Sequence, residues 1–368
     1  MASEWTTIRA ADFIEFNPRL SIKKGAIATK IAMDKLQPFT KKIPATERAS
    51  FAGGSKFCNG DTIMARITPC LENGKTAFVD ILADGEVAFG STEFIVMRAK
   101  ANVSDPQFVY YLATSPIFRN VAIKSMVGSS GRQRVQQSVL DELELTVPPL
   151  EEQKKIGAFL AALDQKIALN NKINDNLQQQ AQAIYASMFI ANADPAWTQG
   201  HLSDLITVKY GKDHKKLADG VYPVFGSGGI MRYVERPLYT GESVLIPRKG
   251  TLNNVMYVNE PFWSVDTMFF TEMKVPNVAK FVFHFVKAKD LASMNAGSAV
   301  PSMTTDILNA LELAIPPADR LAEFESAVAP MYQMMQANSQ ESAKLAELRD
   351  TLLPKLMSGT IDVSSIQI

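Results

Sequence analysis

The chain has 368 residues, of which 46% are hydrophobic and 21% charged, a composition typical of a globular protein with two or three domains. The 38 lysines and arginines balance the 38 aspartates and glutamates, so the net charge neither requires nor excludes a nucleic-acid partner. Two cysteines and three scattered histidines exclude a disulfide framework and argue against a metal-hydrolase centre. Cysteine usage, together with the lack of a signal-peptide pattern or a long apolar run, predicts a cytoplasmic protein with no membrane partner.

The first part of the chain is predicted to be mixed α and β. Turn signals at Asn73-Gly74 and Asp84-Gly85 separate short runs rich in β-forming residues. The predicted strands are Thr62–Ile67, Thr76–Ile81 and Glu93–Arg98, and a helix is expected over Pro106–Ala113.

A long helix follows, because residues 158–189 contain neither glycine nor proline. Positions on one face recur alternately every four and three residues, as in the seam of a coiled coil, with a polar step in the middle. The seam positions are Ile156, Leu160, Leu163, Ile167, Asn170, Asn174, Leu177, Ala181, Ile184 and Met188.

A second mixed part and a second long helix complete the chain. Because strands and helices do not alternate regularly in either part, the predicted fold class is α+β. Pro330 and Pro354 predict that the second helix is kinked or shorter than the first, since proline lacks a backbone N–H and clashes with the preceding turn. The predicted elements of the second part are strands at Ser243–Pro247, Val255–Val258 and Met268–Met273 and a helix at Val278–Lys287.

The two halves of the chain repeat each other. Leu143–Pro149 recurs 168 residues later as Leu311–Pro317, and Trp5–Asp12 has a counterpart at Trp197–Asp204. The predicted organisation is a globular domain at 1–147, a spacer helix at 148–190, a second globular domain at 191–315, and a second spacer helix with a C-terminal tail at 316–368.

The second helix keeps the seam of the first, polar step included, when 168 is added to each position. In an antiparallel pair, facing residue numbers sum to about 512, which places Asn174 opposite Asn338 and Asn170 opposite Ser342. Matched buried amides can fix the register of such a pair. Connectivity favours this arrangement, with a domain at each end and a pseudo-two-fold relation. A parallel pair, or two amphipathic helices on separate cores, also fits the periodicity.

No catalytic motif is found in the sequence. Phe225–Gly229 is rich in glycine but lacks the Walker lysine and the dinucleotide-binding spacing, so it is interpreted as a turn. Val147–Leu150 does not match the Asn/Asp-Pro-Pro-aromatic loop that a DNA methyltransferase needs. Glu151 and Glu152 are interpreted as charges that favour a helix start. The chain is therefore predicted to be non-catalytic, with no cofactor or metal of its own.

Loops rich in cations and amides occur in both globular domains. Arginine can bind guanine, and glutamine adenine, through two hydrogen bonds each, whereas lysine more often contacts phosphate. Each loop taken singly also fits a solvated surface. The candidate DNA-binding residues are Arg132, Gln133, Arg134, Gln136, Lys56, Arg66 and Lys75 in the first domain, and Lys209, Lys212, Lys215, Lys216, Arg248, Lys249, Asn253 and Asn254 in the second.

Several motifs point to one family. They include Pro148-Pro-Leu-Glu-Glu-Gln-Lys-Lys-Ile156 before the first long helix, Gly60-Asp-Thr-Ile63, and Ser91-Thr-Glu-Phe94. With the tandem domain-plus-helix layout, these motifs resemble the specificity (S) subunits of type I restriction–modification systems. The second copy, Pro316–Leu321, lacks Glu-Glu-Gln, so different contacts are expected where the second helix starts.

The resemblance implies that each globular domain reads one half of a split double-stranded DNA site. The helical pair would set the spacing between the halves and dock two methyltransferase (M) subunits, and restriction (R) subunits would join the full complex. S-adenosylmethionine, ATP and Mg²⁺ would be held by those partner subunits. The rival hypothesis is an assembly adaptor that does not bind DNA, which the balanced charge and the methionines of Met331–Met335 also fit.

Overall fold

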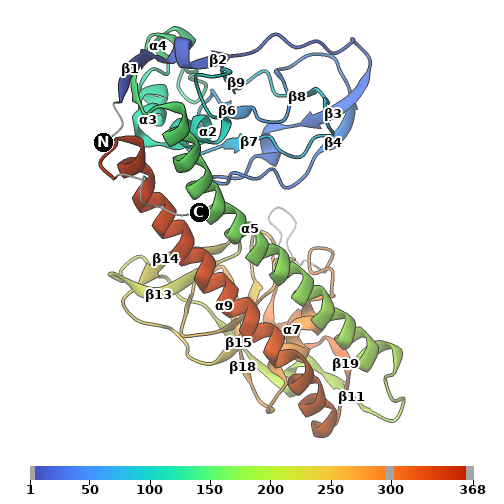
Figure 1. Ribbon diagram of the computed structural model, residues 1–368. Coiled ribbons are helices and arrows are strands. Elements are labelled where there is room, and N and C mark those ends of the chain that lie inside the picture. Colours follow the sequence, from blue (N-terminus) through green and yellow to red (C-terminus); the bar gives the residue numbers. More distant parts are fainter. Residues whose placement is uncertain (1–4, 295–301, 362–368) are drawn as a thin grey trace. The chain divides into compact units, whose positions relative to one another are not determined.

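The computed structural model describes residues 5–294 and 302–361. The chain forms two compact units: unit 1 comprises Met1–Asn171 and Ser339–Ile368, and unit 2 comprises Lys172–Asn338. Each unit contains one globular part and a stretch of both long helices (Figure 1). The mixed strand and helix content of both units confirms the α+β prediction.

The described residues of unit 1 form two four-stranded sheets and one two-stranded sheet. The first sheet has the order β2 (Ile14–Phe16), β9 (Phe94–Ala99), β6 (Thr62–Ala65), β7 (Thr76–Phe78). The second has the order β4 (Glu47–Ser50), β3 (Ile27–Ile31), β8 (Ala88–Gly90), β5 (Lys56–Phe57). In the smallest sheet, β1 (Thr6–Arg9) pairs antiparallel with β10 (Glu144–Val147). The helices of this globular part are α1 (Ala10–Phe13), a 3₁₀ turn at Met33–Lys35, α2 (Pro106–Thr114), α3 (Pro116–Lys124) and α4 (Gln137–Asp141).

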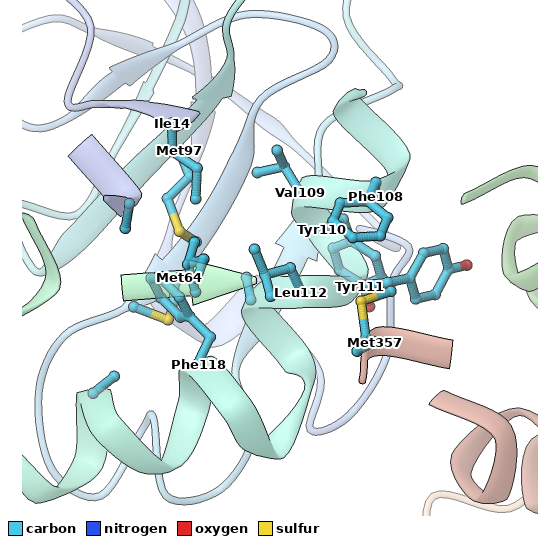
Figure 2. Close-up of a cluster of buried hydrophobic side chains, with 14 of the residues drawn as sticks. Ile14, Met64, Met97, Phe108, Val109, Tyr110, Tyr111, Leu112, Phe118 and Met357 are labelled. Atoms are coloured by element: carbon cyan, nitrogen blue, oxygen red, sulfur yellow. The ribbon is translucent and has the colours of Figure 1, made fainter. Parts of the chain in front are cut away.

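Helix α2 is the centre of the unit 1 core. It begins where the sequence predicts, because the Asp105 side chain accepts a hydrogen bond from the amide of Phe108 at 2.9 Å and Pro106 occupies the first turn. Figure 2 shows its apolar side chains among Met64 and Met97 of the sheet and Met357 near the chain's end. Burial of these side chains holds the sheet, α2 and the long helices of unit 1 together.

The described residues of unit 2 repeat most of this topology, with three strands instead of four in the second sheet. Its first sheet has the order β12 (Ile206–Tyr210), β18 (Met268–Met273), β15 (Glu242–Pro247), β16 (Met256–Asn259), which matches β2-β9-β6-β7 strand for strand. The other sheets are β14 (Gly229–Val234), β13 (Asp219–Gly226), β17 (Trp263–Ser264), and β11 (Thr198–His201) with β19 (Glu312–Ile315). Its helices are α6 (Leu202–Leu205), α7 (Ala279–Lys287) and α8 (Thr305–Asn309).

The repeated motifs of the sequence occupy equivalent places in the two units. The Leu-Glu-Leu segments form β10 and β19, and the two Trp-containing segments form their partners β1 and β11. The registers agree, with Thr6 opposite Val147 and Thr198 opposite Ile315. Even the parallel pairing of β3 with β8 recurs, as β13 with β17.

The two long helices are α5 (Leu150–Ala186), which continues into a π-helical turn at Ser187–Ala191, and α9 (Ala318–Met357). α9 has 40 residues and runs through both Pro330 and Pro354, whereas α5 has 37 residues and its π-helical continuation 5 more, so the two helices are nearly equal in length. Pro330 and Ser326, whose carbonyl loses its helical donor, are exposed, so water can satisfy that carbonyl. Pro354 lies in the last turn, where little helix remains to be interrupted.

In each unit the two helices lie side by side and run in opposite directions (Figure 1). In unit 1 the Arg349 guanidinium donates to Asp164 at 2.6 Å, and in unit 2 the Asn338 amide donates to Asn174 at 2.9 Å. The predicted seam positions on both helices are all buried or half-buried. The parallel and separate-core alternatives are therefore wrong.

The two long helices start differently, as the departure of the second motif copy predicts. The Gln153 side chain is buried and bonds to the Asp105 amide and to the carbonyls of Val103 and Pro148, at 2.9 to 3.1 Å. Leu321, 168 residues later, is buried in the apolar core of unit 2. The start of the first long helix is thus held by side-chain hydrogen bonds, and that of the second by apolar packing.

Candidate nucleic-acid interface

The two basic loops of unit 2 meet at the turn between β17 and β18. The amides of Arg248 and Lys249 donate to the Thr267 carbonyl at 2.8 and 3.2 Å. The amide of Lys212 donates to the Ser264 carbonyl at 2.8 Å. The backbone of Lys212 and that of Arg248 and Lys249, distant from it in sequence, are therefore held next to the same short segment, Ser264–Thr267.

Tyr210 adds an aromatic surface to this group. Its ring lies 5.4 Å from the Arg248 guanidinium, and 53% of the residue is exposed. Arg248 also donates to the Asp266 carbonyl at 3.2 Å. Sequence reasoning missed Tyr210, although its place next to Gly211 and Lys212 in the basic run was a signal.

The remaining candidates of unit 2 divide into paired and exposed side chains. Asn253 donates to Asp290 at 3.0 Å and Asn254 to the Ser227 carbonyl at 2.8 Å, so both amides stabilise loops. Lys209 pairs with Glu272 at 3.5 Å. Lys215 and Lys216 are exposed, and within the described residues their ammonium groups have no hydrogen-bond or ion-pair partner.

In unit 1, Arg66 occupies the position of Arg248. It follows β6 as Arg248 follows β15, and its amide donates to the Glu93 carbonyl at 2.9 Å, as that of Arg248 does to Thr267. The Arg66 carbonyl accepts from the Val135 amide at 2.8 Å, and the Arg248 carbonyl from the Met303 amide at 2.9 Å. Two candidates chosen independently in the sequence thus fall at one position of the repeat.

Arg134 lies beside Arg66 and is held by Glu93. Its Nε and Nη2 atoms donate to the two carboxylate oxygens at 2.7 to 3.0 Å. The Arg134 hydrogen bond is the main cause that lowers the pKa of Glu93, so the carboxyl group is ionised at neutral pH. Glu93 was not among the predicted contacts, although it lies in the Ser91–Phe94 motif.

The other candidates of the 132–136 segment surround this pair. Arg132 is exposed, and its guanidinium has no hydrogen-bond or ion-pair partner within residues 5–294 and 302–361. Gln133 is fixed by its backbone, which exchanges hydrogen bonds with Thr68 at 2.9 and 3.0 Å. The amide of Gln136 donates to the Ser125 hydroxyl at 3.3 Å.

Lys56 and Lys75 have contacts within the fold. The Lys56 ammonium lies 5.5 Å from the centre of the Phe51 ring, and the Lys75 ammonium donates to the Met33 carbonyl at 3.0 Å. In the described part of the chain, no hydrogen bond or ion pair of these side chains links them to Arg66 or Arg134.

The polar step of the helix pair has the contacts that the antiparallel arithmetic predicts. In unit 2, Asn174 also donates to the Met335 carbonyl at 3.2 Å. In unit 1, Asn170 is buried and donates to Glu341 at 2.8 Å and to the Ser342 hydroxyl at 3.3 Å. The role of Asn170, Asn174, Asn338 and Ser342 in fixing the register stays a prediction.

A metal-binding cluster and a membrane-spanning helix are both absent from the described residues. Across the described ranges, no group of three or more His, Cys, Asp or Glu side chains could hold a metal ion. Likewise, none of the described helices is long and apolar enough to cross a bilayer.

Known proteins resemble this chain over most of its length. The type I restriction enzyme HindI specificity subunit of Haemophilus influenzae is 23% identical, with 82% of this chain and 86% of that protein aligned. The MjaVIII specificity subunit of Methanocaldococcus jannaschii is 20% identical over 99% of this chain and 94% of that protein. The crystal structure of a type I restriction–modification S subunit from M. genitalium shares the fold, with a TM-score of 0.62 and 17% identity over 96% of both chains.

A family model described as the type I restriction modification DNA specificity domain matches residues 3–179 and 196–322. These two segments include the globular parts of both units and most of α5. The chain therefore belongs to the type I restriction–modification DNA specificity family.

Proposed function

We propose that this DNA specificity subunit reads a two-part site in double-stranded DNA, one half with each globular domain. The two globular domains, at 1–147 and 191–315, would each bind one half-site. The two long helices, at 148–190 and 316–368 (the latter with the C-terminal tail), would set the spacing between the half-sites. The observation that carries the proposal is the repeat: Arg66 and Arg248 follow equivalent strands, and each has further cations beside it. A basic surface that occurs once in each globular domain suits a DNA site with two half-sites.

The predicted contacts divide by chemistry. Arg132, Arg134 and Arg248 have guanidinium groups that can bind base edges in the major groove. Lys212, Lys215, Lys216 and Lys249 suit phosphates, whose contacts position the protein without reading sequence. Gln133 and Gln136 suit adenine. Asn253, Asn254, Lys56 and Lys75 have internal contacts and would support the loops and sheets that carry the readers.

The helix pair would act as a spacer and a dock. Half-sites read from one face of DNA lie a whole number of helical turns apart, about 34 Å per turn, so their separation must be fixed mechanically. Two methyltransferase subunits would bind the helices and supply adenine methylation with S-adenosylmethionine. Restriction subunits would bring ATP and Mg²⁺ chemistry. The complex would work in the cytoplasm, where the unpaired thiols of Cys58 and Cys70 stay reduced.

The chain itself is a specificity subunit and not an enzyme, as its family membership implies. The rival adaptor hypothesis is not favoured, since the family is one of DNA specificity domains. Whether the candidate side chains contact DNA bases directly has to be tested by experiment.

Adenine methylation mapped across the genome of a cell that expresses this chain with its methyltransferase partner tests the proposal. We expect one motif with two defined parts and a fixed gap. The purified complex should bind a duplex with that motif about 10³-fold or more tightly than a random duplex at physiological salt. No motif, or equal binding to both duplexes across a salt series, would contradict the proposal.

A further inference from the structure

The Arg134–Glu93 ion pair leaves one edge of the guanidinium open. The Glu93 carboxylate accepts hydrogen bonds from Nε and from one side of Nη2, whereas Nη1 has no partner among the described residues. The Arg134 side chain is 48% exposed and that of Glu93 is 24% exposed. The edge formed by Nη1 and the outer side of Nη2 therefore remains available.

The position of Arg134 is set by backbone as well as by the ion pair. Its amide and carbonyl exchange hydrogen bonds with Val127 at 2.9 and 3.0 Å, and it forms a β-bridge with Ile67, next to Arg66. The root of the side chain and its tip are both fixed. Little conformational entropy is left to lose when the guanidinium binds a ligand.

We propose that Glu93 is a positioning residue that holds Arg134 ready to read a guanine in the half-site of unit 1. The inference rests on the proposed function and adds one named base and one residue to it. The O6 and N7 atoms of guanine accept two parallel hydrogen bonds, which the Nη1 and Nη2 edge of a guanidinium can donate.

The charge of the pair favours a base over a phosphate. A phosphate approaching Arg134 also meets the Glu93 carboxylate, which lies within 3.0 Å of the guanidinium nitrogens and repels a second anion. A neutral base edge does not have this penalty. Arg134 thus fits base reading, whereas the exposed Lys215 and Lys216 fit phosphate.

The equivalent position in unit 2 has a different chemistry. The β-bridge between Ile67 and Arg134 is matched by that between Lys249 and Ser302, and the Glu93 carbonyl is matched by that of Thr267. Ser302 and Thr267 are uncharged and cannot form the ion pair. Among the described residues, the arginine held by a carboxylate at this position occurs in unit 1 and has no counterpart in unit 2, so the two half-sites should differ at this base.

The test uses the complex of the full chain with its methyltransferase partner. Genome-wide adenine methylation gives the motif for the wild type and for Glu93→Gln, Arg134→Lys and their combination. Methylation rates are then measured on duplexes in which each G·C pair of the motif is replaced in turn. The matched control is Glu142→Gln, which weakens a different exposed ion pair of unit 1, with Arg9.

We expect one guanine of one half-site to lose its preference by about 5- to 150-fold in Arg134→Lys and Glu93→Gln. The combined variant should lose no more than Arg134→Lys alone, because Glu93 acts through Arg134. The other half-site and the Glu142→Gln motif should not change.

Two results would overturn the inference while leaving the proposed function intact. One is that the wild type has a two-part motif and that Glu93→Gln and Arg134→Lys both keep the same motif with the same base preferences. The other is a uniform loss of methylation at all sites in Glu93→Gln without a change in base preference, the result expected of a phosphate contact or of a structural ion pair. If Glu93→Gln does not assemble, as judged by circular dichroism and gel filtration, Arg134→Lys alone decides between the outcomes. A wild type without any two-part motif would instead contradict the proposed function.

Discussion

The side-chain amide of Asn338 donates a 2.9 Å hydrogen bond to the side-chain oxygen of Asn174, in the polar step of the α5–α9 seam. A half-buried amide pair of this kind has a strong geometric requirement, because a shift of either helix by one turn would place an amide of the polar step against an apolar side chain. We expect this bond to select one register from those that the apolar seam positions would allow.

Replacing both amides in Asn174→Ile with Asn338→Ile should leave the chain folded and its helix content unchanged, but permit other registers. The expected result is a broader range of gap lengths in the methylation motif or a changed oligomeric state by light scattering. Asn171→Ile, at an exposed position of the same helix, is the control. An unchanged gap and oligomeric state in the double variant would contradict the role in register.

Arg132 and Lys215 should have different effects on DNA binding. Arg132→Ala should weaken binding to the specific duplex by about 1–3 kcal/mol and leave random duplex nearly unaffected, since its guanidinium is predicted to contact a base. Lys215→Ala should weaken both duplexes alike and reduce the slope of log K against log salt by about 1. Mobility shifts of the complex over a salt series measure both effects. Equal losses on both duplexes for Arg132→Ala would show that it contacts only phosphate.

The buried Lys41 makes the stability of unit 1 depend on pH above about 8. Its ammonium group is buried against the rings of Phe78, Tyr110 and Tyr111, and desolvation lowers its pKa to about 8. A lysine whose pKa is lower in the folded than in the unfolded chain destabilises the fold while it is charged. Stability should therefore rise as the pH increases through 8.

We expect the free energy of unfolding of the wild type, relative to Lys41→Met, to rise by about 2 kcal/mol between pH 8 and pH 10. Urea denaturation at half-unit pH steps measures this difference. Lys42→Met, at the exposed neighbouring position, should follow the wild type. Parallel pH profiles of the wild type and Lys41→Met would rule out the shifted pKa.

Gln153 should be needed for stability at the start of α5. Gln153→Ala leaves the amide of Asp105 and the carbonyls of Val103 and Pro148 without their buried partner, which should cost about 1–3 kcal/mol. Lys155→Ala, at an exposed position of the same helix, should change stability by less than about 0.5 kcal/mol. Denaturant unfolding compares the two, and equal stabilities would show that the hydrogen bonds contribute nothing net.

The sequence by itself determined the repeat, the α+β class and the two long helices, and it placed Asn174 opposite Asn338 for the case of an antiparallel pair, whose direction only the structure decided. These features have a fixed period or offset that can be counted along the chain. Strand β18 was predicted to the residue, and helices α2 and α7 to within one residue at their ends. Local propensity and turn chemistry are enough for such elements.

Only the tertiary structure decided which polar side chains are paired and which are available. Glu93 and Arg134 are 41 residues apart in the chain, Lys209 and Glu272 are 63 apart, and Asn254 and Ser227 are 27 apart. Strands β1, β10, β11 and β19 pair across more than a hundred residues and have no periodic signal of their own. A charged or amide side chain has the same appearance in a sequence whether it faces water, a carboxylate or DNA, because its partner is chosen by folding and not by its neighbours in the chain.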